Sequence, residues 1–167
     1  MQPTTTTTPQ IDSEARKAAI SVLNDLIQLD FDAVQAYKQA IEKIDDVVAR
    51  SDLEVFQADH QRHIVELSQA VRMMGGEPEK VGRDLKGLLL EGLTALRSVT
   101  GTLGALRAMR TNERLTNRAY ERALQEKLPS AAREVVLKNR EDERRHLASI
   151  EVHIERLSGS PEEDRLA

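Results

Sequence analysis

The sequence contains no cysteine and no tryptophan, and only 2% of its 167 residues are aromatic. Without cysteine there is no disulfide framework, no thiolate nucleophile and no cysteine-ligated zinc or iron–sulfur site. Any metal would have to be held by oxygen atoms and imidazole. No apolar run approaches the roughly 18 residues of a membrane span, and the start, MQPTTTTTPQ, does not resemble a signal peptide. We therefore expect a soluble, cytoplasmic protein.

The chain also lacks an excess of positive charge. Its formal net charge at pH 7 is -4. This balance gives no general attraction to phosphate backbones or anionic lipid, so neither nucleic acid nor a membrane is an expected partner. Charged residues make up 31% of the chain, and Ala, Leu, Glu and Arg recur throughout. Such a composition favours helices, and this length suits about one domain.

Turn signals divide the chain into two predicted helical hairpins. The first helix starts at Asp12 or Ser13 and runs to near Val48, and the second follows the N-cap pair Ser51-Asp52 and stops at GGEP, residues 75–78. In the second hairpin, one helix follows a break at residues 100–102 and another runs from Pro129-Ser130 to about Leu157. The apolar segment 84–99 between the hairpins looks like a short helix in a connection that crosses the bundle.

These elements predict an all-α four-helix bundle with one long crossover and a short extra helix. The bundle is expected to span residues 12–158. Its expected parts are a disordered Thr/Pro tail at 1–11, a first hairpin at 12–75, the crossover at 76–101, a second hairpin at 102–158 and a flexible tail at 159–167.

The two hairpins are copies of one another in sequence. A shift of 83 residues places Tyr37 on Tyr120 and His63 on His146 without a gap. Eleven of the 44 aligned positions from residue 36 to residue 79 are identical, which we interpret as an internal duplication. Two copies of a hairpin predict one bundle with pseudo-twofold symmetry.

The repeat directs six polar side chains toward the interior of the bundle. Each copy has a carboxylate two helical turns before its tyrosine, and a pair of side chains three residues apart on its second helix. Around a pseudo-twofold axis these side chains would meet at one point. They are Asp30, His60 and His63 in the first copy, and Glu113, Glu143 and His146 in the second.

This set suits a metal centre, because carboxylates offset and bridge divalent ions in a low-dielectric interior while imidazoles cap them. Alternatives remain at several positions. His60 could lie outside the ligand set, Asp32 could replace Asp30, and the hydroxyls of Tyr37 and Tyr120 could either bind a ligand carboxylate or simply pack in the core. The remaining charged residues of the repeat are expected in exposed ion pairs, namely Asp59, Arg62, Asp142 and Arg145.

The chain resembles the ferritin-like superfamily of di-iron carboxylate proteins. More closely, the segments LNDLI, MMGGEPE and RAYERAL and the segment around Tyr37 resemble an uncharacterised bacterial family of ferritin-like four-helix bundles, over roughly residues 20–157. In the superfamily the first and third helices each give a Glu, and the second and fourth each give Glu-x-x-His. Asp30 is a shorter carboxylate than the usual Glu, and His60 stands where a bridging Glu is usual. The other positions match, at His63, Glu113, Glu143 and His146.

The resemblance implies one or two iron ions that react with O2 or peroxide, in iron handling or protection from oxidants. Zinc or manganese could replace iron. The alternative is a non-catalytic stress or interaction protein whose metal site is degenerate or structural. In that case the apolar side of residues 85–96 would be a binding or self-association face, for example in a homodimer.

Overall fold

The computed structural model describes residues 13–80 and 99–159, and within these ranges it contains helices and no strand. The helices are α1 (Ser13–Ile41), α2 (Val47–Met73), α4 (Gly101–Ala123) and α5 (Ser130–Gly159). The expected all-α bundle is confirmed. The short helix expected at 84–99 and the two expected tails fall almost wholly outside the described residues. None of the described helices is both long enough and apolar enough to cross a membrane.

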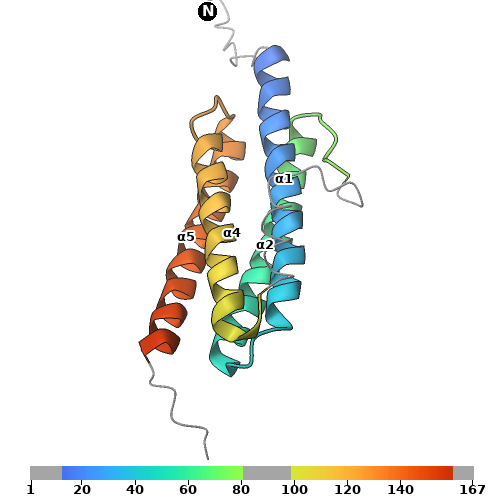
Figure 1. The fold of residues 1–167 in the computed structure, drawn as a ribbon. Helices are drawn as coiled ribbons and strands as arrows, with labels where there is room; N and C mark the ends of the chain where they lie inside the picture. The colour runs from blue at the N-terminus through green and yellow to red at the C-terminus, as the bar shows by residue number, and fades with distance from the viewer. Residues whose placement is uncertain (1–12, 81–98, 160–167) are drawn as a thin grey trace, which may run out of the picture.

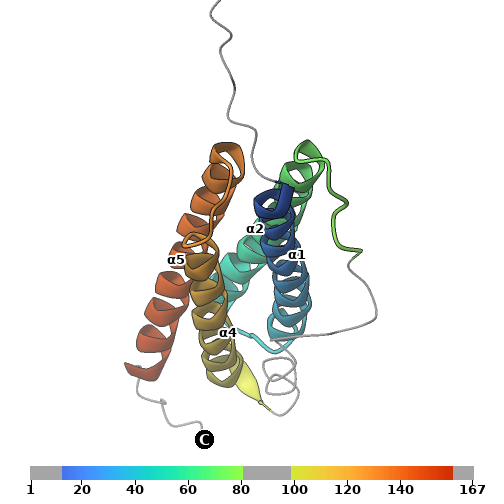
Figure 2. The same cartoon turned by 90° about the horizontal axis from the view of Figure 1, so that it is seen from above.

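The helices form two hairpins that lie side by side, α1 with α2 and α4 with α5 (Figures 1 and 2). Contacts between the hairpins join α1 to α4 and α2 to α5. Each helix therefore touches two others and leaves its remaining face to solvent. The arrangement explains the long amphipathic segments of the sequence, since a helix in a four-helix bundle buries only one side.

The apolar core is split into two clusters. One cluster includes Ile44, Leu53, Leu106 and Ile150, and the other includes Leu23, Ile27, Leu67 and Val136. All of these side chains are fully buried, and each contributes roughly 1.5–3 kcal/mol by leaving water. None of the six candidate ligands belongs to either cluster. The apolar layers thus stabilise a bundle that also holds a buried polar centre.

The turn of the first hairpin differs from the prediction. Helix α1 ends at Ile41 rather than near Val48, and Asp46, not the pair Ser51-Asp52, is the N-cap of α2. The Asp46 side chain accepts a hydrogen bond from the Ala49 amide at 2.8 Å, which satisfies one of the free donors at the helix start. The sequence offers two acidic caps, Asp46 and Asp52, and only the fold selects between them.

Candidate metal centre

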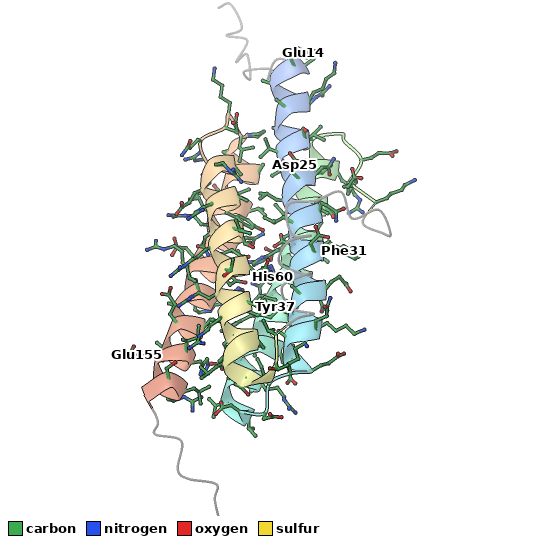
Figure 3. The ribbon with its side chains drawn as sticks, in the orientation of Figure 1. Glu14, Asp25, Phe31, Tyr37, His60 and Glu155 are labelled. Carbon is green, nitrogen blue, oxygen red and sulfur yellow. The ribbon has the colours of Figure 1, made fainter. Side chains whose placement is uncertain are left out.

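The six candidate ligands come together in the middle of the bundle, where Figure 3 labels His60 next to Tyr37 between the helices. Every one of them has 0% of its surface exposed. All four helices contribute, since Asp30 lies on α1, His60 and His63 on α2, Glu113 on α4, and Glu143 and His146 on α5.

Their ligand atoms fall into two groups of four, and in each group these atoms lie within 4.8 Å of one another. The Asp30 half-site consists of Asp30, His60, His63 and Glu143. The Glu113 half-site consists of His60, Glu113, Glu143 and His146. The two shared residues, His60 and Glu143, are equivalent in the repeat. His60 thus occupies a position between the half-sites where the second copy has a carboxylate.

Most of the ligand atoms have no hydrogen-bond partner although they are buried. A buried polar atom without a partner costs about 1–3 kcal/mol, so proteins rarely leave several together. Here six of them converge: His60 Nε2, His63 Nδ1, His146 Nδ1, Glu113 Oε2 and both carboxylate oxygens of Glu143. Nitrogen and oxygen atoms of this kind are the ligands that iron, zinc and manganese bind in proteins.

Asp30 differs from the other two carboxylates, because both of its oxygens have partners. Its Oδ1 lies 2.8 Å from Nδ1 of His60, and its Oδ2 accepts a hydrogen bond of 2.6 Å from the Tyr120 hydroxyl. The other ring nitrogen of His60, Nε2, faces Glu113 at 3.5 Å from Oε1. The imidazole of His60 is therefore held on one side by Asp30 and faces the Glu113 half-site on the other.

The two tyrosines form a symmetric pair of hydrogen bonds across α1 and α4. Tyr37 donates to Glu113 at 2.7 Å, just as Tyr120 donates to Asp30. Both rings are fully buried, and burial raises the pKa of each hydroxyl well above its ordinary value, so both remain donors. Of the two alternatives that the sequence left open, the bond to a candidate ligand carboxylate is the one present.

A ring of charges lies behind the histidines, between α2 and α5. Asp59 is only 7% exposed and lies 3.0 Å from Nε2 of His146, while Asp142 lies 3.2 Å from Nε2 of His63. This leaves Nδ1 of each imidazole directed at the centre. Two arginines join these carboxylates, and each Arg donates to both of them. The ring consists of Asp59, Arg62, Asp142 and Arg145.

This ring is less exposed than the sequence predicted. The expected ion pairs exist, but Asp59 is buried and Asp142 partly buried rather than exposed, and both carboxylates contact imidazoles. Burial raises the pKa of Asp59, but His146 and Arg62 outweigh it and hold the pKa at about 2. The available signal was the repeat itself, since these Asp and Arg positions are identical in the two copies.

Two histidines of the centre hold protons in the absence of metal. Burial lowers the pKa of His63, but the carboxylates of Asp30 and Glu143 outweigh it and raise the pKa to about 9. Burial also opposes the charge on His60, yet Glu143 and Asp30 raise its pKa well above the ordinary 6.5. These positive charges balance the buried carboxylates, which otherwise would be very costly to bury.

The Glu113 half-site contains the groups that burial keeps neutral. Burial raises the pKa of Glu143 to about 8 and lowers that of His146 to about 4. At neutral pH the His146 imidazole therefore carries a free lone pair, while Glu143 holds a proton. A metal ion entering the centre would displace protons from Glu143 and the charged histidines, so binding should strengthen as pH rises.

Residues 18–126 match the model of a family described as a domain of unknown function (DUF2383). That match covers more than half of the chain. The chain belongs to this family. The matched range covers α1 from residue 18 onward, α2 and α4, and it stops before Glu143 and His146 of α5. No curated protein sequence matches the chain.

Two solved structures share the fold of this DUF2383 protein. One is a two-domain protein with DJ-1/ThiJ/PfpI-like and ferritin-like domains from Anabaena variabilis, at 13% identity and a TM-score of 0.71, covering 91% of this chain and 40% of that one. The other is a ferritin-like, diiron-carboxylate protein from Bacillus anthracis, at 19% identity and a TM-score of 0.56, covering 88% and 97%. The bundle is therefore ferritin-like.

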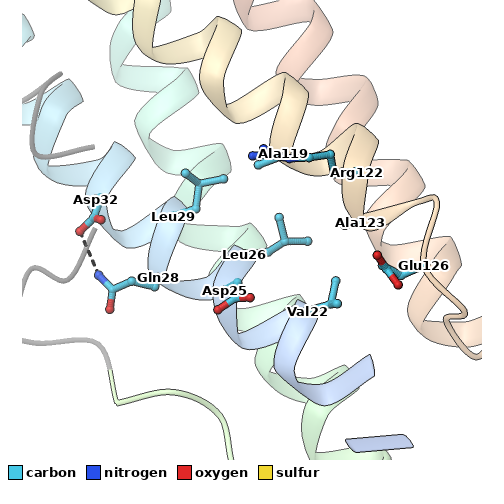
Figure 4. A pocket seen from close by; sticks show the side chains of 10 residues that line it. All are labelled: Val22, Asp25, Leu26, Gln28, Leu29, Asp32, Ala119, Arg122, Ala123 and Glu126. Carbon is cyan, nitrogen blue, oxygen red and sulfur yellow. Dashed lines mark hydrogen bonds between the residues drawn. The ribbon is translucent and has the colours of Figure 1, made fainter. Parts of the chain in front are cut away.

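The DUF2383 bundle also has a cavity of about 470 Å³ between α1 and α4, which is separate from the polar centre (Figure 4). Its lining includes Leu26, Leu29, Ala119 and Arg122 and none of the six candidate ligands. Asp32, the sequence alternative to Asp30, lies in this lining and accepts a hydrogen bond from Gln28 at 2.9 Å. The structure thus directs Asp30, and not Asp32, to the centre.

Proposed function

We propose that the buried centre binds one or two iron ions and reacts with O2 or peroxide, in iron handling or in protection from oxidants. The observation that carries the proposal is the convergence of six unpartnered, fully buried ligand atoms from three histidines and two glutamates. An apolar interior of equal volume would avoid their desolvation cost. One ion in each half-site would compensate that cost by bonding to the atoms that face it.

The charge of the centre supports a divalent ion. Asp30, Glu113 and Glu143 bring three negative charges when ionised, so one divalent ion leaves a net charge of -1 and two leave +1. Imidazole and carboxylate together suit iron, and also zinc and manganese. Bound iron would supply one-electron chemistry toward O2 or peroxide.

The residues around the ligands would position them and keep the centre dry. Tyr37 and Tyr120 orient the carboxylates of Glu113 and Asp30 through their hydroxyls. The Asp59 and Asp142 carboxylates fix the ring orientation of the histidines, as outer-shell carboxylates commonly do for metal-bound imidazole. With no ligand exposed to solvent, only small molecules such as O2 or peroxide are suitable reactants.

A second candidate function is a non-catalytic bundle with a structural metal. The hydrogen bond between Asp30 and His60 favours it, because this bond occupies two atoms that a complete two-metal site would use. Zinc, which has no redox chemistry, would serve such a role.

The test is an anaerobic Fe2+ titration of untagged, chelator-treated protein, followed by exposure to air and measurement of the remaining Fe2+. We expect at least one Fe2+ per chain and faster loss of Fe2+ than in buffer alone. The double variant His63→Ala/His146→Ala is the control and should bind no iron above background. Equal binding by this variant, or none by the unmodified protein, contradicts the proposal. Binding of Zn2+ or Fe2+ without reaction in air favours the structural alternative.

A further inference from the structure

The two half-sites are not equivalent, because the imidazole of His60 can serve only one of them. A carboxylate offers two oxygens and can bridge two ions, whereas a neutral imidazole has one N–H and one lone pair. His60 stands between the half-sites with Nδ1 on the Asp30 side and Nε2 on the Glu113 side. The half-site that faces the nitrogen with the lone pair gains His60 as a ligand. The other half-site faces the N–H group and has one ligand fewer.

The hydrogen bond to Asp30 decides the tautomer of His60. An ionised carboxylate is an acceptor only, so the 2.8 Å contact requires the proton on Nδ1 of His60. When metal binding displaces the second proton of His60, the lone pair therefore falls on Nε2, which faces Glu113 and has no hydrogen-bond partner. This is the usual arrangement of metal-binding histidines, in which the nitrogen away from the metal donates to a carboxylate.

The half-sites also differ in whether their ligand atoms are already engaged with one another. Metal–ligand bonds of about 2.0–2.2 Å in a tetrahedral site place ligand atoms roughly 3.3–3.6 Å apart. In the Glu113 half-site, Nδ1 of His146 lies 3.9 Å from Oε2 of Glu113 and 3.9 Å from Oε2 of Glu143, close to an open tetrahedron. In the Asp30 half-site, Nδ1 of His63 lies 3.6 Å from Oδ1 of Asp30 and 3.1 Å from Oε1 of Glu143, so the spacing there also suits a small ion. The difference is that Oδ1 of Asp30 is already held by Nδ1 of His60 at 2.8 Å, a hydrogen bond that an ion in this half-site would have to break.

We propose that the centre binds a first divalent ion in the Glu113 half-site, with Nε2 of His60, Glu113, Glu143 and Nδ1 of His146 as ligands. Asp30 then acts as the acceptor that fixes the His60 ring, not as a ligand of this ion. Two carboxylates neutralise the single divalent ion. The inference rests on the proposed function, in that the centre must bind metal at all, and it adds which half binds first.

The repeat provides matched variants for the test. His146 and His63 are equivalent, as are Glu113 and Asp30, and one member of each pair belongs to each half-site. The probe is Co2+, whose visible absorption reports the coordination geometry and whose stoichiometry is counted by native mass spectrometry. The unmodified protein should bind a first Co2+ with a tetrahedral spectrum and a second, if any, at least about tenfold more weakly.

Variants of the two half-sites should differ in their affinity for the first Co2+. His146→Ala and Glu113→Gln should each weaken the first Co2+ by more than about 100-fold, which exceeds a typical outer-shell loss. His63→Ala should change it by less than about threefold, and Asp30→Asn, whose amide oxygen can still accept from His60, by less than about tenfold. Helicity measured by circular dichroism verifies that each variant folds. Glu113→Gln, which keeps the side-chain shape, carries the test if His146→Ala does not fold.

Equal loss in His63→Ala and His146→Ala, a larger loss in His63→Ala, or two Co2+ ions bound with one affinity would overturn this inference while the proposed metal binding stands. Absence of Co2+ and Fe2+ binding by the unmodified protein would overturn the proposed function, and the inference with it.

Discussion

Raising the pH should destabilise the metal-free protein through the buried histidine His63. Its pKa lies near 6.5 in an unfolded chain and at about 9 in the folded protein, where Asp30 and Glu143 outweigh the opposing effect of burial. The folded state thus keeps a proton that the unfolded state releases. The resulting stabilisation is fully present below pH 6.5 and is lost as pH rises through about 9. This difference in pKa corresponds to about 3 kcal/mol.

Glu143 adds to the effect in the same direction. Burial raises its pKa from 4.5 to about 8, so an unfolded chain at alkaline pH gains from an ionisation that the folded centre resists. His146 acts at the other end of the range. Because burial lowers its pKa from 6.5 to about 4, its contribution to stability falls as the pH drops below 6.5. The contribution of Glu143 falls as the pH rises above 4.5, so the two effects offset one another between these values. The metal-free protein should therefore be most stable between about pH 4.5 and 6.5.

The assay is urea unfolding in the presence of a chelator, followed by far-ultraviolet circular dichroism at pH 6.5 and at pH 9. The unfolding free energy of the unmodified protein should be lower at pH 9 by about 3 kcal/mol or more. The variant His63→Ala should lose less over the same interval, because only His60 and Glu143 still contribute. A flat profile between the two pH values, or an equally steep loss in His63→Ala, would refute the reasoning.

Two further predictions concern the surroundings of the ligands. Phe56 is 5% exposed and stacks on His146 with ring centroids 4.4 Å apart. Phe56→Ala should therefore lower the free energy of unfolding, measured in urea, by about 3–5 kcal/mol. The control Val55→Ala changes an exposed side chain and should lower it by less than about 0.5 kcal/mol. A loss equal to that of Val55→Ala would contradict this packing. Asp59→Ala removes the acceptor behind His146 and should weaken Co2+ binding about 10- to 100-fold without loss of helicity, whereas unchanged affinity would show that the ring does not orient the imidazole.

The fold could be predicted because the duplication constrains it more strongly than helix propensity does. Tyr37 and Tyr120 identify the same interior face in both copies, and from that face the candidate ligands follow by helical spacing. The ends of the helices could not be predicted equally well. Asp46 and Asp52 are both plausible caps, and the choice depends on where the turn lets α2 pack against α1.

The burial of the charge ring and its contacts with the histidines were not predicted, for a different physical reason. A run such as EDERR on a helix is usually a solvated surface, and spacing alone places Asp142 at the margin of the buried face. Only the packing of α2 on α5 brings Asp142 to His63 and Asp59 to His146 across the interface. Each aspartate thus contacts the histidine of the other helix. These contacts depend on the distance and relative rotation of α2 and α5, which the sequence of one helix does not determine.

The duplication also shows where the two halves of the centre have diverged. The outer parts of the two copies are the same, with a tyrosine on each ligand carboxylate and an aspartate behind each outer histidine. The inner positions differ. The first copy has Asp30 and His60 where the second copy has Glu113 and Glu143. Both differences act together, because the shorter Asp30 accepts from the imidazole that replaces a carboxylate. A frame of nearly equal halves therefore holds unequal candidate ligands, and the proposed preference of a first ion for the Glu113 half-site depends mainly on this one hydrogen-bonded pair.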